Sequence, residues 1–246
     1  MDDKEIQEYV EQRYIIFMEH YRIAKNRYDE IWKKYEQEMP ACIEECTEIG
    51  RTLSADRNGP QGIYWVGKRP LLLFAGREHY GWYGETNWPA GKQNICFSPL
   101  EFAFYTVSSM GSYWAIVKEL IANVLQIDLG DWDAVLEKVA FTNACKCLSG
   151  SDTYKWHLHQ NCLKHGYLAH EIQIVKAPVN VLFTKSYELS AVIFSSGTEI
   201  MRDNEFSVRK MGGQYIIECA HPGRQSHEWR AALKSLMTRY LGENEV

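Results

Sequence analysis

Short, continuously apolar runs alternate along the chain with longer stretches in which apolar residues recur every three or four positions. The apolar runs have the length and composition of strands buried on both faces of a parallel sheet, and they occupy residues 71–75, 139–142, 179–183 and 215–219. Helical periodicity covers residues 112–125, 161–176 and 226–240. Because strands that alternate with helices are typical of α/β folds, we predict a three-layer α/β/α domain around a central, largely parallel sheet.

The first 40 residues follow a different pattern. Between Lys4 and Glu38 the apolar positions recur at steps of three and four, which predicts one long amphipathic helix, and they are Val10, Tyr14, Phe17, Tyr21, Ala24, Tyr28, Ile31 and Tyr35. We expect this helix, within residues 1–40, to pack on a single domain formed by residues 41–246. A dimerising coiled coil is the alternative, although four tyrosines at heptad spacing are unusual for a tight seam.

The charge of the chain is unevenly distributed. The formal net charge is −5, and residues 1–50 carry 7 Lys/Arg and 13 Asp/Glu, which leaves 20 against 19 for residues 51–246. A net negative charge opposes nucleic-acid binding, because phosphate contacts need positive potential. Since the acidic excess belongs to the N-terminal segment, the remainder can still carry a basic groove.

Cysteine content and hydropathy bear on the compartment. The sequence has no apolar run of membrane-spanning length, and its first residues are acidic and amphipathic, so we expect neither a membrane partner nor a signal peptide. Its seven cysteines are an odd number and do not form an extracellular disulfide pattern. We therefore expect a cytoplasmic protein. The sequence leaves the oligomeric state open, and a monomer is the default expectation.

Three polar residues follow directly on predicted strands. Glu78 follows the first strand, Asn143 the second, and His221 the last. Taken singly, such an Asn is more often a turn or cap residue and such a His a structural hydrogen bonder. Parallel strands, however, bring their carboxyl ends to one edge of a sheet, where α/β proteins bind ligands. The three residues together therefore predict a functional site.

The segments around these residues resemble motifs of the uracil-DNA glycosylase superfamily. The sequence GREHYG at residues 76–81 and NICFS at 94–98 are similar to the GQDPYHG motif and the CFS segment of its best-known branch. TNACKC at 142–147 is similar to a TNxxKC motif of the iron-sulfur branch, and HPGRQS at 221–226 to the last motif, HPSPLS. The resemblance covers residues 71–241, and it implies DNA as the partner and monofunctional N-glycosylase activity.

The resemblance also implies roles for individual residues. Glu78 and His221 fall on the catalytic positions, Tyr80 on the residue that walls the base pocket, Phe97 on the stacking aromatic and Asn143 on the base-reading amide. Physical chemistry supports these roles, since a base rotated out of DNA needs a stacking face and an amide that reads its Watson–Crick edge. A carboxylate near C1′ and a donor near the base O2 stabilise the transition state.

The segment after His221 is implied to approach the DNA. In the family this motif meets the backbone and minor groove, which makes Arg224, Gln225 and Ser226 the expected DNA contacts. Arg224 or Gln225 would occupy the space of the extruded base. An ordinary exposed loop is the alternative reading of these residues.

Two departures from the family motif concern the substrate. The chain has Glu78 and His79 where the family usually has a shorter residue and Pro, and Phe97 follows Glu78 by 19 positions, a longer segment than in the uracil enzymes. Aromatic faces and hydrogen-bonding groups, which suit a hexose, enrich that segment at Trp82, Tyr83, Asn87 and Trp88.

The enlarged segment therefore resembles the antiphage members of the superfamily, which remove glucosylated hydroxymethylcytosine from phage DNA. Three alternatives stay open. The first is that the segment packs only on its own aromatic residues. The others are that the chain is an ordinary uracil-DNA glycosylase of base-excision repair, or that it is a non-catalytic module that binds modified DNA.

Four cysteines match the positions that bind a 4Fe-4S cluster in the iron-sulfur branch. They are Cys42, Cys46, Cys147 and Cys162. A cluster of this kind needs four thiolates in one neighbourhood, and the resemblance implies a structural role for it. The first pair has C-x3-C spacing where the branch usually has C-x2-C, and Cys145 is a substitute for Cys147. Reduced buried thiols and a zinc site are the alternatives.

Overall fold

A computed structural model describes the chain in segments, namely residues 29–31, 33, 34, 37, 38, 41, 69–76, 111–129, 131–144, 162–185, 191, 193–223 and 225–243. Within these segments the strands are β1 (Leu72–Gly76), β2 (Val139–Asn143), β3 (Val179–Leu182), β4 (Thr198–Arg202), β5 (Phe206–Met211) and β6 (Gln214–Cys219). The helices are α3 (Gly111–Leu125), α4 (Trp132–Lys138), α6 (Tyr167–Val175) and α8 (His227–Gly242). The predicted α/β class is thereby confirmed.

The six strands form one mixed sheet in the order β2-β1-β3-β6-β5-β4. The neighbouring strands β2, β1, β3 and β6 are parallel, and they are the strands that the apolar runs predicted. Because β1 connects to β2 on one side while the chain then passes to β3 on the other, the direction of strand order reverses between β1 and β3. Ligands of open α/β sheets bind at such a reversal, beyond the carboxyl ends of the strands.

The hairpin of β4 and β5 was not predicted. Both pairings at this end of the sheet, β4 with β5 and β5 with β6, are antiparallel, so the sheet is less uniformly parallel than the sequence suggested. The edge strand β4 has four exposed residues among its five. An edge strand with so little buried surface has no continuous apolar run, which explains why hydrophobic patterning did not identify it.

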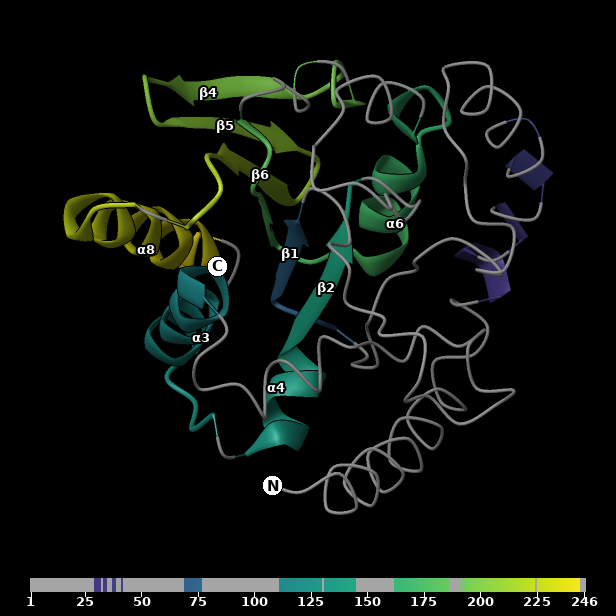
Figure 1. The fold of residues 1–246 in the computed structure, drawn as a ribbon. Helices are drawn as coiled ribbons and strands as arrows, with labels where there is room; N and C mark the ends of the chain where they lie inside the picture. Colours follow the sequence, from purple (N-terminus) through teal and green to yellow (C-terminus); the bar gives the residue numbers. More distant parts are fainter. Residues whose placement is uncertain are drawn as a thin grey trace.

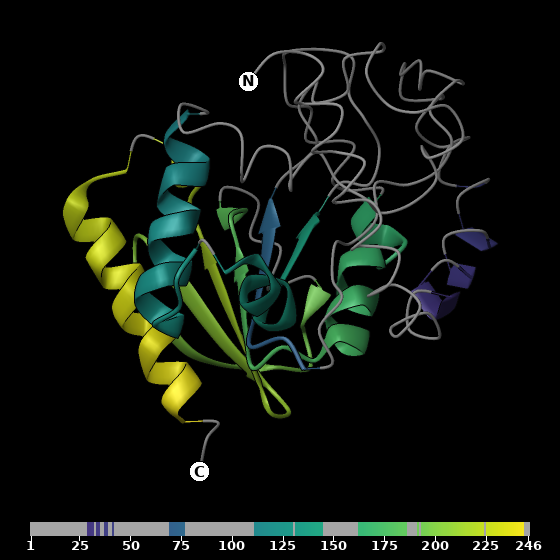
Figure 2. The same cartoon turned by 90° about the horizontal axis from the view of Figure 1, so that it is seen from below.

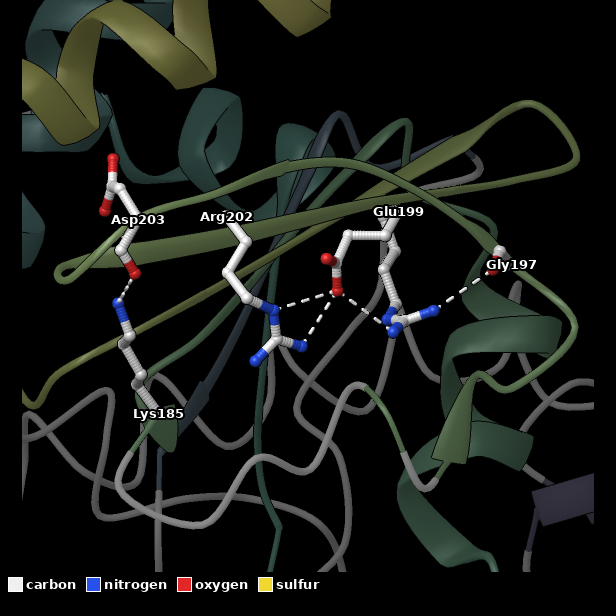
Figure 3. Close-up of polar contacts among 6 residues, drawn as sticks. Lys185, Gly197, Glu199, Arg202 and Asp203 are labelled. Carbon is white, nitrogen blue, oxygen red and sulfur yellow. Dashed lines mark hydrogen bonds and ion pairs between the residues drawn. The ribbon is translucent and has the colours of Figure 1, made fainter.

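A β-bulge between Glu199 and Met201 organises the charges of this hairpin. Glu199 pairs with Arg209 and Arg202 pairs with Ser207, so the bulge brings Glu199 and Arg202 to the same face. The Glu199 carboxylate accepts hydrogen bonds from Arg202 Nη2 at 2.8 Å and from Arg209 Nη2 at 3.1 Å. Figure 3 shows this network on the hairpin. Its members are partly exposed, so they fix local geometry more than they add stability.

Helices cover both faces of the sheet. Figures 1 and 2 show α3 and α8 together on one face and α6 on the other, which is the predicted three-layer arrangement. The β1 residues Leu72–Ala75 are fully buried between these layers, at 0% exposure. Phe74 stacks between Phe141 of β2 and Phe183 after β3, with ring centroids 5.9 and 6.0 Å away.

The predicted helices 112–125 and 226–240 correspond to α3 and α8. The predicted helix 161–176 is interrupted, because Gly166 adopts a left-handed φ of 66° before α6 begins. Helix α4 was not predicted. At the start of α8, Ser226 Oγ accepts a hydrogen bond from Trp229 N at 3.2 Å and so caps the helix.

The N-terminal prediction is covered only in part. The described residues from 29 to 41 are helical, and the remainder of the predicted N-terminal helix lies outside the described residues. Lys34 Nζ lies 5.9 Å from the centre of the Tyr167 ring at the start of α6. Among the helices in the described part of the chain, none is both long and apolar enough to cross a membrane.

Candidate functional site at the carboxyl ends of the strands

Five residues lie together at the carboxyl edge of the sheet, around the reversal of strand order. We call Gly76, Tyr113, Asn143, Phe183 and His221 the strand-end cluster. Gly76 and Asn143 are the last residues of β1 and β2 and pair in register, Phe183 follows β3, and His221 lies two residues beyond β6. Tyr113 comes from the first turn of α3. The predicted convergence of Asn143 and His221 on this edge is therefore present.

The Asn143 side chain lies directly over Gly76. Asn143 is buried, with 8% of its surface exposed, and a Cβ atom placed on Gly76 would lie 2.3 Å from Asn143 Oδ1. Such a separation is far inside van der Waals contact, so only glycine leaves room for the amide in this orientation. The ladder continues past Asn143, since Ala144 N donates to Gly76 O at 2.9 Å. The glycine that opens the first motif thus sets the position of the amide in the second.

The His221 ring has a defined tautomer in this arrangement. Gly223 N donates a hydrogen bond to His221 Nδ1 at 3.1 Å. Because a backbone N–H can only donate, this hydrogen bond needs the lone pair of Nδ1 and so favours the ring form that carries its proton on Nε2. The site therefore contains an imidazole that can donate one hydrogen bond from Nε2.

The turn that carries His221 is braced by its own backbone and side chains. Gln225 Nε2 donates to His221 O at 3.0 Å, and Gln225 N donates to Pro222 O at 3.3 Å. Ser226 then caps α8. Two of the three predicted DNA contacts, Gln225 and Ser226, thus have structural partners, and their contact with DNA stays a prediction; Arg224 lies outside the described residues.

Tyr113 and Phe183 were not identified from the sequence. The Tyr113 ring stacks on His221, with centroids 5.0 Å apart and an interplanar angle of 26°. Its edge meets the Phe183 ring at 5.6 Å and 77°. Burial raises the pKa of Tyr113, and the nearby Cys219 thiol raises it further by a smaller amount, so the phenol is neutral. Only the α3 periodicity marked Tyr113, and periodicity predicts a core position and not a site.

Two buried carboxyl groups accept hydrogen bonds from threonines close to the ends of β2 and β3. Thr142 Oγ1 donates to Glu171 Oε2 of α6 at 2.7 Å, and Thr184 Oγ1 donates to Glu218 Oε1 of β6 at 3.2 Å. Thr142 adjoins Asn143 and Thr184 adjoins Phe183, so each hydrogen bond ties a residue next to the strand-end cluster to a neighbouring helix or strand. Burial raises the pKa of Glu171 well above its usual value, so this carboxyl keeps its proton in the folded protein at pH values where an exposed glutamate has lost it.

The substitution Glu171→Gln is expected to change how stability depends on pH. The unfolded chain releases the Glu171 proton near pH 4.5 while the folded protein retains it, so the free energy of unfolding of the wild type falls as the pH rises above that value. Glutamine keeps an oxygen acceptor for Thr142 and has no proton to release. We expect the variant to gain up to about 1.4 kcal/mol per pH unit relative to wild type. Urea denaturation at several pH values measures this difference, and a difference independent of pH would contradict it.

Lys185 lies at the same edge of the sheet, and its side chain is bonded to the β4–β5 turn. Its Nζ donates to the backbone oxygen of Asp203, in the β4–β5 turn, at 3.0 Å, as Figure 3 shows. Burial lowers the pKa of Lys185. The Asp203 carboxylate is itself occupied by the backbone N–H groups of Glu205 and Phe206. Lys185 therefore braces the turn.

Most of the remaining predicted site residues lie outside the described residues: Glu78, Tyr80, Trp82, Tyr83, Asn87, Trp88, Phe97, Cys42, Cys46 and Cys147. Cys162 is described, and it is buried, with 2% exposure. Within the segments that the structure describes, His, Cys, Asp and Glu side chains form no group of three that could hold a metal ion. Because three of the four predicted ligands are outside those segments, this finding does not bear on the predicted 4Fe-4S cluster.

Comparison with known proteins adds no family. No protein-family model matches the chain, and a search of curated proteins gives no significant match.

Proposed function

We propose that the chain is a DNA N-glycosylase that rotates a modified pyrimidine out of DNA and hydrolyses its N-glycosidic bond, leaving an abasic site. The observation that carries this proposal is that Asn143, which lies over Gly76, and His221, which stacks on Tyr113, share one edge of the sheet at the reversal between β1 and β3. The amide offers a donor and an acceptor to the Watson–Crick edge of an extruded base. The imidazole offers a donor from Nε2 beside it. An amide and a neutral imidazole on one sheet edge suit base recognition and release.

The geometry of His221 suits the departure of the base. Cleavage of the glycosidic bond develops positive charge on the sugar and negative charge on the pyrimidine. A donor that is already oriented toward the base O2 stabilises that negative charge without reorganising. The Gly223 N–H that binds Nδ1 at 3.1 Å keeps the proton on Nε2, where the base can use it. The neutral Tyr113 phenol adds no negative charge beside the leaving base.

The remaining roles in this proposal come from the sequence motifs. Glu78, two residues beyond β1, orients the attacking water and stabilises the sugar cation. Phe97 stacks on the base and Tyr80 walls it. Residues 82–88 receive the hexose of glucosylated hydroxymethylcytosine, a base of phage DNA, which gives the enzyme its place in antiviral defence. Arg224, Gln225 and Ser226 meet the DNA beside the extruded base.

Substrate screening tests this proposal. The wild type is incubated with single- and double-stranded DNA that contains uracil, hydroxymethylcytosine or glucosylated hydroxymethylcytosine, and abasic sites are then cleaved with alkali. We expect strand breaks with the glucosylated DNA and none with Glu78→Gln or Asn143→Ala. Asn123→Ala, on the far end of α3 from the cluster, is the matched control and should retain activity.

The possible outcomes separate the alternatives. Breaks only in the uracil-containing DNA would replace the glucosylated substrate with uracil and leave the reaction class intact. Tight binding to modified DNA without breaks would identify a non-catalytic binding module. No breaks in any DNA, with the wild type indistinguishable from Glu78→Gln, would contradict the glycosylase proposal.

We also propose that Cys42, Cys46, Cys147 and Cys162 hold a structural 4Fe-4S cluster. The described residues near these positions fit such a site. Glu38, four residues before Cys42, lies against His165, three residues after Cys162, with Glu38 Oε2 3.0 Å from His165 Nδ1. Cys162 is buried, and the α6 that follows it is joined to β2 through Glu171 and Thr142. The Glu38–His165 contact thus joins the segment before Cys42 to the segment after Cys162.

Metal analysis of anaerobically purified protein is expected to find iron and acid-labile sulfide in equal amounts, with a brown colour. Cys162→Ala should lose both iron and thermal stability, because the cluster joins the N-terminal segment to α6. Cys219→Ala, which removes a buried thiol that is not a proposed ligand, should retain the iron. A colourless wild-type protein without metal would contradict the proposal, and zinc in its place would identify a different site.

A further inference from the structure

Tyr113 contacts other members of the strand-end cluster on several sides. Its ring face stacks on His221 at 5.0 Å and its ring edge meets Phe183 at 5.6 Å. Its hydroxyl oxygen lies 3.6 Å from the point that a Cβ on Gly76 would occupy, and Asn143 Oδ1 lies 2.3 Å from the same point. One side chain from α3 therefore contacts His221 and lies, like the Asn143 amide, against Gly76.

We propose that Tyr113 is a positioning residue, which holds the His221 imidazole in one fixed orientation for release of the base. This inference rests on the proposed glycosylase function. It assigns a role to a residue of α3, whereas the residues to which the proposed reaction already gives roles belong to the strand ends and the loops that follow them.

The His221 ring needs a second constraint beyond its own turn. The hydrogen bond from Gly223 orients Nδ1, but one hydrogen bond restricts rotation of the ring about its Cβ–Cγ bond only in part. The stacked Tyr113 face, inclined by only 26° to the imidazole, restricts that rotation and so directs Nε2–H. The stabilisation that aromatic pairs of this kind contribute beyond their buried area favours one ring orientation about two- to twelvefold.

Tyr113 is itself held rigidly, as a positioning residue must be. Phe183 meets it edge-on at 77°, and Phe183 stacks in turn on Phe74 of β1 at 6.0 Å. This aromatic series connects the site to the fully buried strand β1. The hydroxyl end of Tyr113 is buried beside Gly76, and its raised pKa keeps it protonated, so it places no anion beside the departing base.

The test compares Tyr113→Phe with Tyr113→Leu. Phenylalanine keeps the stacked face, so we expect kcat within about threefold of wild type, whereas leucine removes the flat face. Because the stack favours one ring orientation by at most about twelvefold, we expect Tyr113→Leu to lose about tenfold in kcat with little change in KM. Tyr240→Leu is the matched control. Tyr240 lies on α8, and its ring stacks on that of Tyr215 with the centroids 4.4 Å apart, so this variant also removes a stacked tyrosine. It should lose stability without losing kcat.

A second measurement needs no substrate. In protein labelled with ¹⁵N-histidine, the His221 nitrogens of wild type and Tyr113→Phe should show one neutral tautomer with the proton on Nε2. Tyr113→Leu should show exchange broadening or a mixture of tautomers. Unchanged His221 signals in a folded Tyr113→Leu, or losses of kcat equal to those of Tyr240→Leu, would overturn the proposal. If the wild type releases no base, the glycosylase function fails while the nitrogen signals still decide the positioning role.

Discussion

Gly76→Ala is expected to yield a folded protein that has lost base recognition. The new Cβ would lie 2.3 Å from Asn143 Oδ1, and because that oxygen ends a side chain, the amide rotates away while the sheet stays intact. Alanine in a strand is otherwise more favourable than glycine. We therefore expect a melting temperature close to that of the wild type, together with a loss of about 10²-fold in kcat/KM, the usual effect of displacing a substrate-positioning group by about 1 Å.

The measurements for this variant are steady-state rates on the released base, thermal unfolding, and the NMR signals of the Asn143 side-chain amide. Gly213→Ala is the matched control, because nothing lies within 4 Å of a Cβ at that position and its φ is not positive. It should leave both the rates and the amide signals unchanged. Unchanged Asn143 signals in Gly76→Ala would contradict the close approach itself. Shifted signals with unchanged kcat/KM would remove Asn143 from base recognition.

The parallel strands could be predicted because each is buried on both faces. Leu72–Ala75 have no polar position to obscure the pattern, and their burial at 0% exposure is what a continuous apolar run indicates. The convergence of Asn143 and His221 followed from parallel strand direction alone. Strand order could not be predicted, since the sequence does not record that β3 lies beside β1. That order places the reversal, and therefore the site, at Gly76.

The antiparallel hairpin and Tyr113 show where patterning fails. The β4 strand depends on backbone pairing and on charges brought to one face by the bulge at Glu199 and Met201, and neither leaves a hydrophobic signal. Tyr113 reads as a core residue of an amphipathic helix. Its contact with His221 joins positions more than 100 residues apart, a relation that only tertiary packing creates. The loops of the site beyond β1 lie outside the described residues, so their predicted roles stay predictions.

His221→Leu is expected to reduce kcat by about 10²- to 10³-fold, the usual effect of removing one donor that stabilises developing charge. Leucine fills a similar volume and can still pack on Tyr113, so the fold should be retained. KM should change little, because the donor strengthens its contact mainly as the base acquires negative charge in the transition state. Rates on the released base, measured with the binding affinity for the same DNA, separate these effects.

The matched control for His221→Leu is His170→Leu, since His170 lies on α6, on the face of the sheet opposite α3 (Figure 2). It should keep full activity. The base itself provides a further check, because a substrate whose leaving group is intrinsically better needs less stabilisation at O2. We therefore expect the loss in His221→Leu to be smaller for pyrimidines with electron-withdrawing substituents. An equal loss for all leaving groups, or a loss confined to KM, would show that His221 binds DNA without assisting the departure of the base, and the role derived from its Nε2 proton would be wrong.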